Sequence, residues 1–281
     1  MEHGNAEQRL TLVEVDGLRE YLSKHREGEY FLVDVREPVE YEMGHIPGAT
    51  LIPLGEVESR IEELEPAKDA IFYCRSGKRS RAAAAMAVDS GRFSGAVYSF
   101  EGGFMAWDGK TLEDFPEVKA FENVQGIEEA LKVAMEMEKG AWRFYRGILE
   151  RYPDSSFATV CQELAELEHR HAEVVYRYLR KHSESGVEAP FEDLFAELPG
   201  DILEGGEPME KALQRASSWM GDENLSFSEL ALDVEYRAYD LYRNLWMDAS
   251  DADEKEVFLS LAEQEKGHVR VVARHLQRSM K

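Results

Sequence analysis

The sequence predicts two domains: an α/β domain with a parallel sheet and helices on both faces, followed by an all-α four-helix bundle. Up to residue 115, short apolar segments alternate with helical patterns, which is typical of a parallel sheet with helical crossovers. Beyond residue 126, apolar residues keep helical spacing over long stretches. One helical pattern also occurs twice at a constant offset of 97 residues, so the second domain contains an internal duplication.

The composition narrows the class of protein. A length of 281 residues with 43% hydrophobic content fits two globular domains, each with its own core. The net charge of −23 disfavours nucleic-acid and membrane partners, since their phosphates would be repelled. The N-terminal residues lack an apolar signal segment, and the two cysteines, Cys74 and Cys161, are too few for a disulfide framework. We therefore expect a cytoplasmic protein.

The elements expected in the first domain, residues 1–115, follow from apolar spacing and turn residues. Residues 13–23 have helical spacing, and residues 30–35 (YFLVDV) form a compact apolar strand. Residues 45–49 contain Pro and Gly and predict a turn. The elements expected after it are a strand over 50–52, a helix over 56–64, a strand over 70–73, an alanine-rich helix over 80–90, a strand over 96–100 and a short helix after Gly102 and Gly103.

The segment CRSGKRSR, residues 74–81, is the chemical centre of this domain. Cys74 follows a central parallel strand, at the sheet edge where ligands bind. The residues after it turn into a helix N-terminus, whose N–H groups form an anion site. With Arg75, Lys78 and Arg79 nearby, this field is expected to lower the pKa of the Cys74 thiol and favour the thiolate. The alternative interpretation is a buried structural cysteine beside a solvated basic turn.

The first domain resembles a single-domain rhodanese, the sulfurtransferase family. The resemblance rests on residues 34–49 (DVREPVEYEMGHIPGA), on residues 74–80, and on Gly102 and Gly103 with Trp107. It implies that Cys74 accepts a sulfane sulfur from a donor, carries it as a persulfide and passes it to a thiol acceptor. The implied substrate-binding loop consists of Arg75, Ser76, Gly77, Lys78, Arg79 and Ser80.

The same resemblance separates this loop from that of related phosphatases. Their loop is one residue longer, so phosphatase activity is disfavoured. We expect Asp34 and Arg36 to organise the edge of the sheet rather than to act in catalysis, and Trp107 to belong to the core.

Residues 116–125 are expected to form a linker, because Pro116 and a mixed polar sequence break the preceding pattern. The second domain, residues 126–281, should contain four long helices over 127–151, 153–182, 226–247 and 252–277. Residues 183–225 would form the single long crossover that a bundle of two antiparallel hairpins requires, with short helices near 190–197 and 208–218. Cys161 is expected in the core, and His169 on the solvent side.

The duplication places carboxylates and histidines on the predicted helices. Fifteen of forty-two positions in 138–179 are identical at the offset of 97. The repeated pattern consists of Glu138, Glu168 and His171 in the first copy and Glu235, Glu265 and His268 in the second. A Glu and a His three residues apart share one helix face, and two such pairs with two further Glu residues can hold two metal ions. This donor set suits iron or manganese. The alternative is a solvated surface without metal.

The second domain resembles the rubrerythrin branch of the ferritin-like family, through the six residues above with Tyr145 and Tyr242. The resemblance implies a non-haem di-iron centre with two Fe ions per chain. The implied ligands are Glu168 and Glu265 as bridges, Glu138 and Glu235 as terminal carboxylates, and His171 and His268 as one imidazole for each iron. Tyr145 and Tyr242 would hydrogen-bond the carboxylates.

Two departures from the family pattern matter. Rubrerythrins often carry a further carboxylate one turn beyond the third Glu, where this chain has Ala238. Two cysteines cannot form the rubredoxin domain that many members carry, so electrons would come from a separate rubredoxin-like donor. A homodimer is expected. The main hypothesis is a redox enzyme that joins a persulfide-forming sulfurtransferase to a di-iron peroxidase or oxidase. The alternatives are a sulfurtransferase whose bundle is only a dimerisation platform, and an iron-handling protein.

Overall fold

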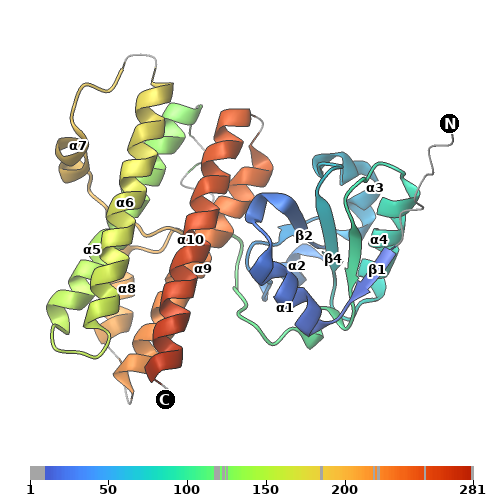
Figure 1. The fold of residues 1–281 in the computed structure, drawn as a ribbon, viewed down its shortest axis with the longest axis horizontal. Helices are drawn as coiled ribbons and strands as arrows, with labels where there is room; N and C mark the ends of the chain where they lie inside the picture. The colour runs from blue at the N-terminus through green and yellow to red at the C-terminus, as the bar shows by residue number, and fades with distance from the viewer. Residues whose placement is uncertain are drawn as a thin grey trace. The chain divides into compact units, whose positions relative to one another are not determined.

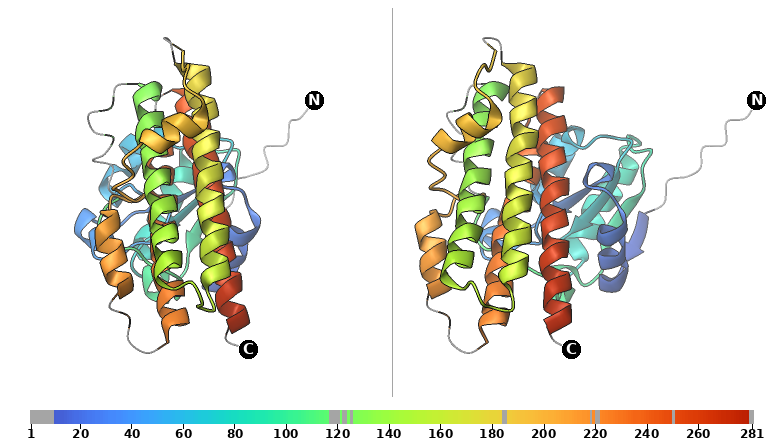
Figure 2. Two further views of the ribbon diagram at one scale, coloured as in Figure 1. Left: turned by 90° about the vertical axis from the view of Figure 1, so that its left-hand side faces the viewer. Right: turned by 60° about the vertical axis from the view of Figure 1, so that its left-hand side comes forward.

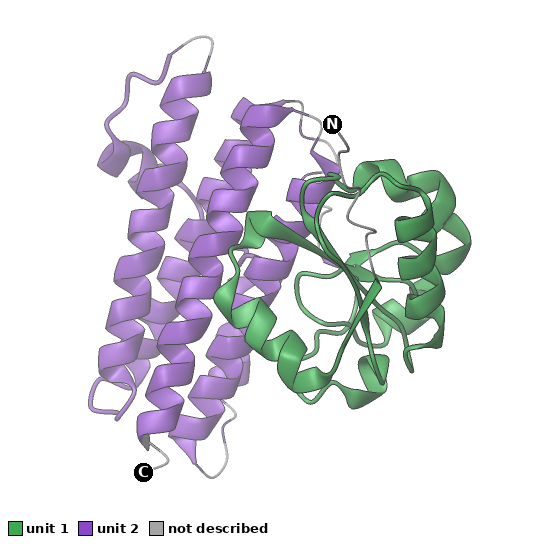
Figure 3. Cartoon of the chain, turned by 45° about the vertical axis from the view of Figure 1, so that its right-hand side comes forward, with its two compact units in different colours: residues 1–115 green, residues 116–281 purple. Residues whose placement is uncertain are grey.

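The structure is a computed structural model that describes residues 10–116, 121, 124, 126–183, 186–217, 219, 222–249 and 251–279. The chain divides into two compact units, residues 1–115 and 116–281 (Figure 3). The first unit contains a parallel sheet with helices and the second is helical, which confirms the predicted fold class. Most of the expected linker, 116–125, lies outside the described residues. Within the described part of the chain, no helix combines the length and the apolar character that a membrane span needs.

A five-stranded parallel sheet forms the centre of the first unit. Its strands are β1 (Leu10–Val13), β2 (Tyr30–Asp34), β3 (Thr50–Leu51), β4 (Asp69–Tyr73) and β5 (Val97–Phe100), in the order β1-β5-β4-β2-β3. The strand β4 is therefore central, with Phe72 paired to Val33 on one side and Ser99 on the other. The edge strand β1 was not among the predicted strands. Its four residues are too few to show a period, and pairing with β5 fixes their conformation.

Helices cover both faces of this sheet (Figure 1). They are α1 (Val15–Lys24), α2 (Pro38–Glu42), α3 (Val57–Arg60) and α4 (Lys78–Asp89), with 3-10 turns at Glu27–Glu29, Leu54–Glu56, Ile61–Glu63 and Gly103–Ala106. On one face, Ile71 and Tyr73 of β4 pack in a cluster with Leu18 of α1. On the other, Ser99 hydrogen-bonds Ser80 of α4 at 3.0 Å. Side chains of a strand buried on both faces must alternate in this way.

The second unit is a four-helix bundle. Its long helices are α5 (Ile127–Arg151), α6 (Ala158–His182), α9 (Glu223–Asp248) and α10 (Ala252–Ser279), and they run side by side (Figures 1 and 2). Helix α5 packs against α6, α9 packs against α10, and α6 also contacts α10. The crossover carries α7 (Phe191–Glu197), which packs on α5 and α6, and α8 (Met209–Ser217), which packs on α5 and α9.

Two details of the bundle differ from the prediction. Helix α6 begins at Ala158 rather than at Pro153, because Ser155 and Ala158 close turns back to Tyr152 and Ser155. His169 is half-buried rather than solvent-facing, since the crossover folds back over α6 and its ring packs against Phe195 with centroids 5.0 Å apart.

Candidate functional site

Cys74 lies between the end of β4 and the N-terminus of α4. Its Sγ atom accepts a hydrogen bond from the backbone N–H of Gly77 at 3.2 Å and lies 3.7 Å from Oγ of Ser80. The carbonyl of Cys74 accepts the N–H of Phe104 at 2.7 Å, which fixes the start of the loop. The loop therefore curls around the sulfur with backbone donors directed at it, the arrangement that binds anions.

This environment stabilises the thiolate. Burial raises the pKa of the Cys74 thiol. The backbone N–H groups of Ser80 and Ser76, the Ser80 hydroxyl and the Gly77 N–H outweigh that effect, and the pKa lies below that of an ordinary thiol. A thiolate is the nucleophilic form of cysteine, so the residue is suited to reaction rather than to packing alone.

The basic residues of the loop act differently from the expectation. Arg79 forms a two-pronged ion pair with Glu40, with both distances 2.7 Å, and this pair lowers the pKa of Glu40 to about 2. Arg79 is thus neutralised by a carboxylate. Arg75 and Lys78 are exposed, and within the described residues neither forms an ion pair. Backbone dipoles and the Ser80 hydroxyl, rather than cationic side chains, are the main groups that lower the pKa of Cys74.

Asp34 and Arg36 hold the neighbouring edge of the sheet together. The Arg36 guanidinium donates to both carboxylate oxygens of Asp34, at 2.9 and 2.6 Å, and to the carbonyl of Gly44 at 2.7 Å. Both side chains are buried. The pair ties the end of β2 to the turn that precedes β3, a structural role. Trp107 is only half-buried, and its indole N–H donates to the carbonyl of Lys110 at 2.9 Å.

The pH dependence of Cys74 reactivity provides a test of this local electrostatic scheme. Because the pKa is lowered, the thiolate persists below the pH at which an ordinary thiol is protonated, and reactivity falls as the pH drops through that lowered value. In Ser80→Ala, loss of the hydroxyl donor should move this fall in reactivity, the acid limb of the pH profile, to higher pH. Alkylation rates by iodoacetamide, with the labelled residue located by mass spectrometry, measure the shift.

The matched control for this prediction is Ser76→Ala. Ser76 acts on the sulfur through its backbone N–H, which the substitution retains, so its acid limb should stay in place. Equal pH profiles for Ser80→Ala and the unmodified protein would contradict the assignment.

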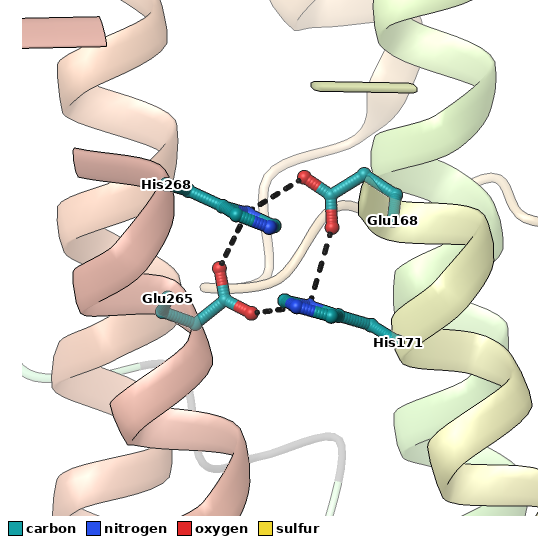
Figure 4. Close-up of side chains that lie close together, drawn as sticks. All are labelled: Glu168, His171, Glu265 and His268. Atoms are coloured by element: carbon teal, nitrogen blue, oxygen red, sulfur yellow. Dashed lines mark ion pairs between the residues drawn. The ribbon is translucent and has the colours of Figure 1, made fainter. Parts of the chain in front are cut away.

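A second set of reactive side chains lies inside the bundle. Glu168 and His171 of α6 face Glu265 and His268 of α10, and all four point toward one another (Figure 4). Nδ1 of His171 is 3.0 Å from Glu265, and Nδ1 of His268 is 3.2 Å from Glu168. The two imidazole rings are stacked with centroids 4.3 Å apart. One ligand atom from each of the four residues lies within 4.8 Å of the others.

The remaining predicted residues extend this cluster on both sides. Glu138 of α5 lies 3.5 Å from Nδ1 of His171, and Glu235 of α9 lies 2.9 Å from Nδ1 of His268. Each copy of the repeat supplies a tyrosine to the other. The Tyr145 hydroxyl donates to Glu235, and the Tyr242 hydroxyl donates to Glu138 at 3.1 Å. The six repeated residues are at most 4% exposed, which excludes the interpretation of a solvated carboxylate face.

Comparison with known families agrees with this geometry. The rubrerythrin profile matches residues 129–276, just over half of the chain. The chain belongs to the rubrerythrin family. A second profile, that of the rhodanese-like domain, matches residues 18–110. This rubrerythrin therefore joins a rhodanese-like domain to the bundle, as the sequence motifs predicted.

Individual relatives resemble shorter parts of this rubrerythrin. YqhL of Bacillus subtilis is 42% identical over 79 residues, which are 28% of this chain and 61% of YqhL. The putative sulfurtransferase YtwF of Bacillus subtilis is 39% identical over 83 residues, 30% of this chain and 78% of YtwF. A sulfurtransferase of Allochromatium vinosum is 38% identical over 79 residues, 28% of this chain and 72% of that protein. The chain thus spans between 61% and 78% of the length of these relatives.

Matches to solved structures also cover only part of this chain. The crystal structure of a rhodanese-like domain protein from Staphylococcus aureus has 25% identity and a TM-score of 0.33, and the match covers 37% of this chain and 98% of that one. A rhodanese with anions from E. coli has 29% identity and a TM-score of 0.27, covering 30% of this chain and 98% of that one.

The bundle of this rubrerythrin has donor atoms that fit metal ions. Among the described residues, eight buried side-chain atoms of the cluster have no hydrogen-bond partner. They are Oε2 of Glu138 and Glu204, both carboxylate oxygens of Glu168 and Glu265, Nδ1 of His171 and Nε2 of His268. The two imidazoles lie within ion-pair distance of Glu265 and Glu168. Two imidazoles cannot compensate five buried carboxylates, and uncompensated buried charge costs several kcal/mol, so a cation is the expected partner. Carboxylate and imidazole donors without a thiolate suit iron or manganese.

Glu204 is the residue of this cluster that the sequence analysis missed. It lies in the crossover, is 1% exposed, and accepts a hydrogen bond from Tyr242 at 3.3 Å. Burial, followed by the negative charge of Glu138, raises its pKa well above the ordinary carboxyl value. Glu204 stands outside the duplicated helices, so neither periodicity nor the repeat indicates it. The only local signal is a single acidic residue between Leu203 and Gly205 in a turn sequence.

Proposed function

We propose that this rubrerythrin is a two-site redox enzyme. Cys74 carries sulfane sulfur as a persulfide, and the cluster in the bundle holds two iron ions for the reduction of peroxide. The observation that carries the second part is the set of eight buried donor atoms without hydrogen-bond partners, which converge from α5, α6, α10 and the crossover. The first part is supported by the lowered pKa of Cys74 and by the backbone donors around its sulfur.

The proposed sulfur transfer proceeds in two displacements. The Cys74 thiolate attacks the outer sulfur of a donor such as thiosulfate, the S–S bond of the donor breaks, and sulfite leaves with the electron pair. An acceptor thiolate then attacks the outer sulfur of the Cys74 persulfide and restores the Cys74 thiolate. The backbone N–H of Gly77 and the Ser80 hydroxyl stabilise the cysteine sulfur each time it carries negative charge. Exposed Arg75 and Lys78 at the loop would attract an anionic donor.

Glu168 and Glu265 would each contribute to both positions of the proposed iron site. Glu138 and His171 would complete one position, and Glu235 and His268 the other. When bound, a pair of ferrous ions supplies the two electrons that convert peroxide, with two protons, to two molecules of water. Tyr145 and Tyr242 orient the terminal carboxylates through their hydroxyl groups. The buried bundle interior excludes bulk water from the site. A separate rubredoxin-like protein would return the electrons.

Metal content is the direct test of this proposal. Elemental analysis of the full chain, purified from iron-replete cells, should give about two irons per chain. The loaded protein should consume hydrogen peroxide in the presence of a reduced rubredoxin or a chemical reductant. Protein stripped by a chelator should lose this turnover and regain it when ferrous iron is restored. Equal turnover with and without metal would overturn the proposal, as would a full chain that takes up no metal.

The alternative of a bundle that serves only as a dimerisation platform does not account for its interior. A platform needs complementary outer surfaces, whereas here the carboxylates and imidazoles are buried and face one another. Their desolvation would lower stability without benefit to an interface. The homodimer itself stays a prediction, which sedimentation of the full chain tests.

A further inference from the structure

The turn that carries Glu204 is inserted deeply into the bundle. On α5, a Cβ atom at Gly140 would lie 2.0 Å from the carbonyl oxygen of Ile202, so glycine is required for the crossover to pass this close. In the crossover itself, a Cβ atom at Gly205 would lie 2.6 Å from Cβ of Arg237 on α9. Glycine at both contacts allows the backbone on either side of Glu204 to approach α5 and α9 more closely than a side chain would permit.

Hydrogen bonds fix this turn in one conformation. The N–H of Leu203 donates to the carbonyl of Glu207 at 2.8 Å, and the N–H of Met209 donates to the carbonyl of Asp201 at 2.9 Å. Arg143 of α5 donates to the Asp201 carboxylate at 2.7 Å. The side chain of Leu203 is 1% exposed and belongs to the apolar core of the bundle. The position of Glu204 is therefore set by the fold on both sides of it.

The Glu204 carboxylate enters the metal cluster on one side only. A ligand atom of Glu204 lies within 4.8 Å of ligand atoms from Glu138, Glu168 and Glu265. Its Oε1 atom shares the Tyr242 hydroxyl with Glu138, and its buried Oε2 atom has no partner. One hydroxyl proton cannot fully satisfy two carboxylates. Oε2 of Glu204 therefore lies in the cluster without a hydrogen-bond donor.

The repeat supplies no counterpart of Glu204. The duplicated segments are 138–179 and 235–276, and residue 204 lies between them. At the other end of the cluster, both oxygens of Glu235 are already engaged, by Tyr145 and by His268. The repeated helices give the two metal positions equivalent donors, and Glu204 makes them different. One turn beyond Glu235, where α9 could have supplied a carboxylate, the residue is Ala238.

We propose that Glu204 is a seventh ligand of the metal centre, supplied by the crossover, and that it binds only the ion held by Glu138 and His171. This inference rests on the proposed function, since it requires that the cluster binds metal. Four shared and terminal carboxylates balance two divalent ions in charge, and Glu204 adds one further negative charge at a single position. That position should therefore bind its ion more tightly than it would with the repeated ligands alone.

Metal binding by Glu204→Gln tests the proposal. The substitution keeps the shape of the side chain and removes its charge. Under anaerobic titration with ferrous iron, the unmodified chain should bind about two ions. The variant should bind one ion with unchanged affinity and the other at least about tenfold more weakly. With ⁵⁷Fe, one of the two Mössbauer doublets should change and the other should remain. Glu210→Gln, an exposed residue of α8, is the control for the change of charge and should match the unmodified chain.

The outcomes separate this proposal from the proposed function. Two ions bound by Glu204→Gln with unchanged affinities and doublets would overturn the ligand role of Glu204 alone. Equal weakening of both ions would also overturn it, because it indicates a general effect on the bundle. An unmodified chain that binds no iron would instead overturn the proposed function. Should circular dichroism show that Glu204→Gln does not fold, Glu204→Asp gives a second reading, since it keeps the charge and shortens the reach. Selective weakening of one ion supports the assignment, and its absence overturns it.

Discussion

Replacing both Glu168 and Glu265 with alanine should remove iron from the bundle and abolish peroxide turnover. These two residues are the carboxylates common to both proposed metal positions, and all four of their oxygens are buried without hydrogen-bond partners. Without them, each ion would keep a terminal carboxylate and an imidazole, with Glu204 in addition at one position. Removal of outer residues around a metal already costs about 10- to 100-fold in affinity, so loss of both bridges should exceed a hundredfold. Iron content by elemental analysis and peroxide consumption measure the result.

The double variant has a matched control and an internal one. Glu166→Ala with Glu256→Ala removes the same charge from α6 and α10 at exposed positions, and should retain about two irons. Sulfur transfer at Cys74 should continue in both double variants, since their substitutions lie outside the rhodanese-like domain. Peroxide turnover that persists after loss of the bridges, with iron absent, would show that the bundle is not the reactive site.

The sequence predicted the helical part of this cluster because the spacing of residues along a helix determines which of them share a face. A Glu and a His three residues apart must share a face, and the offset of 97 residues showed that two such faces belong together. The structure brings these residues to one centre because α6 and α10 pack against each other. Glu204 had no such signal. Its place depends on how a crossover with two short helices folds back, and on close approaches at Gly140 and Gly205 that tertiary packing alone creates.

For the cysteine loop too, the sequence predicted the local structure but not the long-range contacts that determine its electrostatics. Its position between a strand and a helix follows from local pattern, and with it the prediction of a lowered thiol pKa. The sequence also suggested Arg79 as a cause, because it stands close in the chain. Its pairing with Glu40, 39 residues away, becomes visible only when α2 and α4 are placed in the fold. Ser80 is among the main groups that lower the pKa of Cys74, through its hydroxyl and its N–H. A long-range ion pair thus reduces the effect of a charge that is close in the chain.

Cys74→Ser should abolish sulfur transfer, whereas Cys161→Ala should leave it intact. The two cysteines of the chain have opposite environments. Backbone donors hold the pKa of Cys74 below the ordinary thiol value, while burial alone raises the pKa of Cys161 to about 12. At any given pH, Cys74 therefore has the larger thiolate fraction of the two, and a serine hydroxyl cannot form a persulfide. Mass spectrometry of the full chain after incubation with thiosulfate should show one added sulfur in Cys161→Ala and none in Cys74→Ser.

The same pair of variants tests whether the two sites need each other. Cys161 is fully buried in the apolar core of the bundle near Leu164, so Cys161→Ala also reports whether a small core cavity disturbs iron binding. If Cys74→Ser retains about two irons and full peroxide turnover with an external reductant, the metal site works without the persulfide. If turnover falls while iron content stays constant, sulfur at Cys74 contributes to the reaction in the bundle. Added sulfur on Cys161 in the Cys74→Ser variant would contradict the assignment of the reactive cysteine.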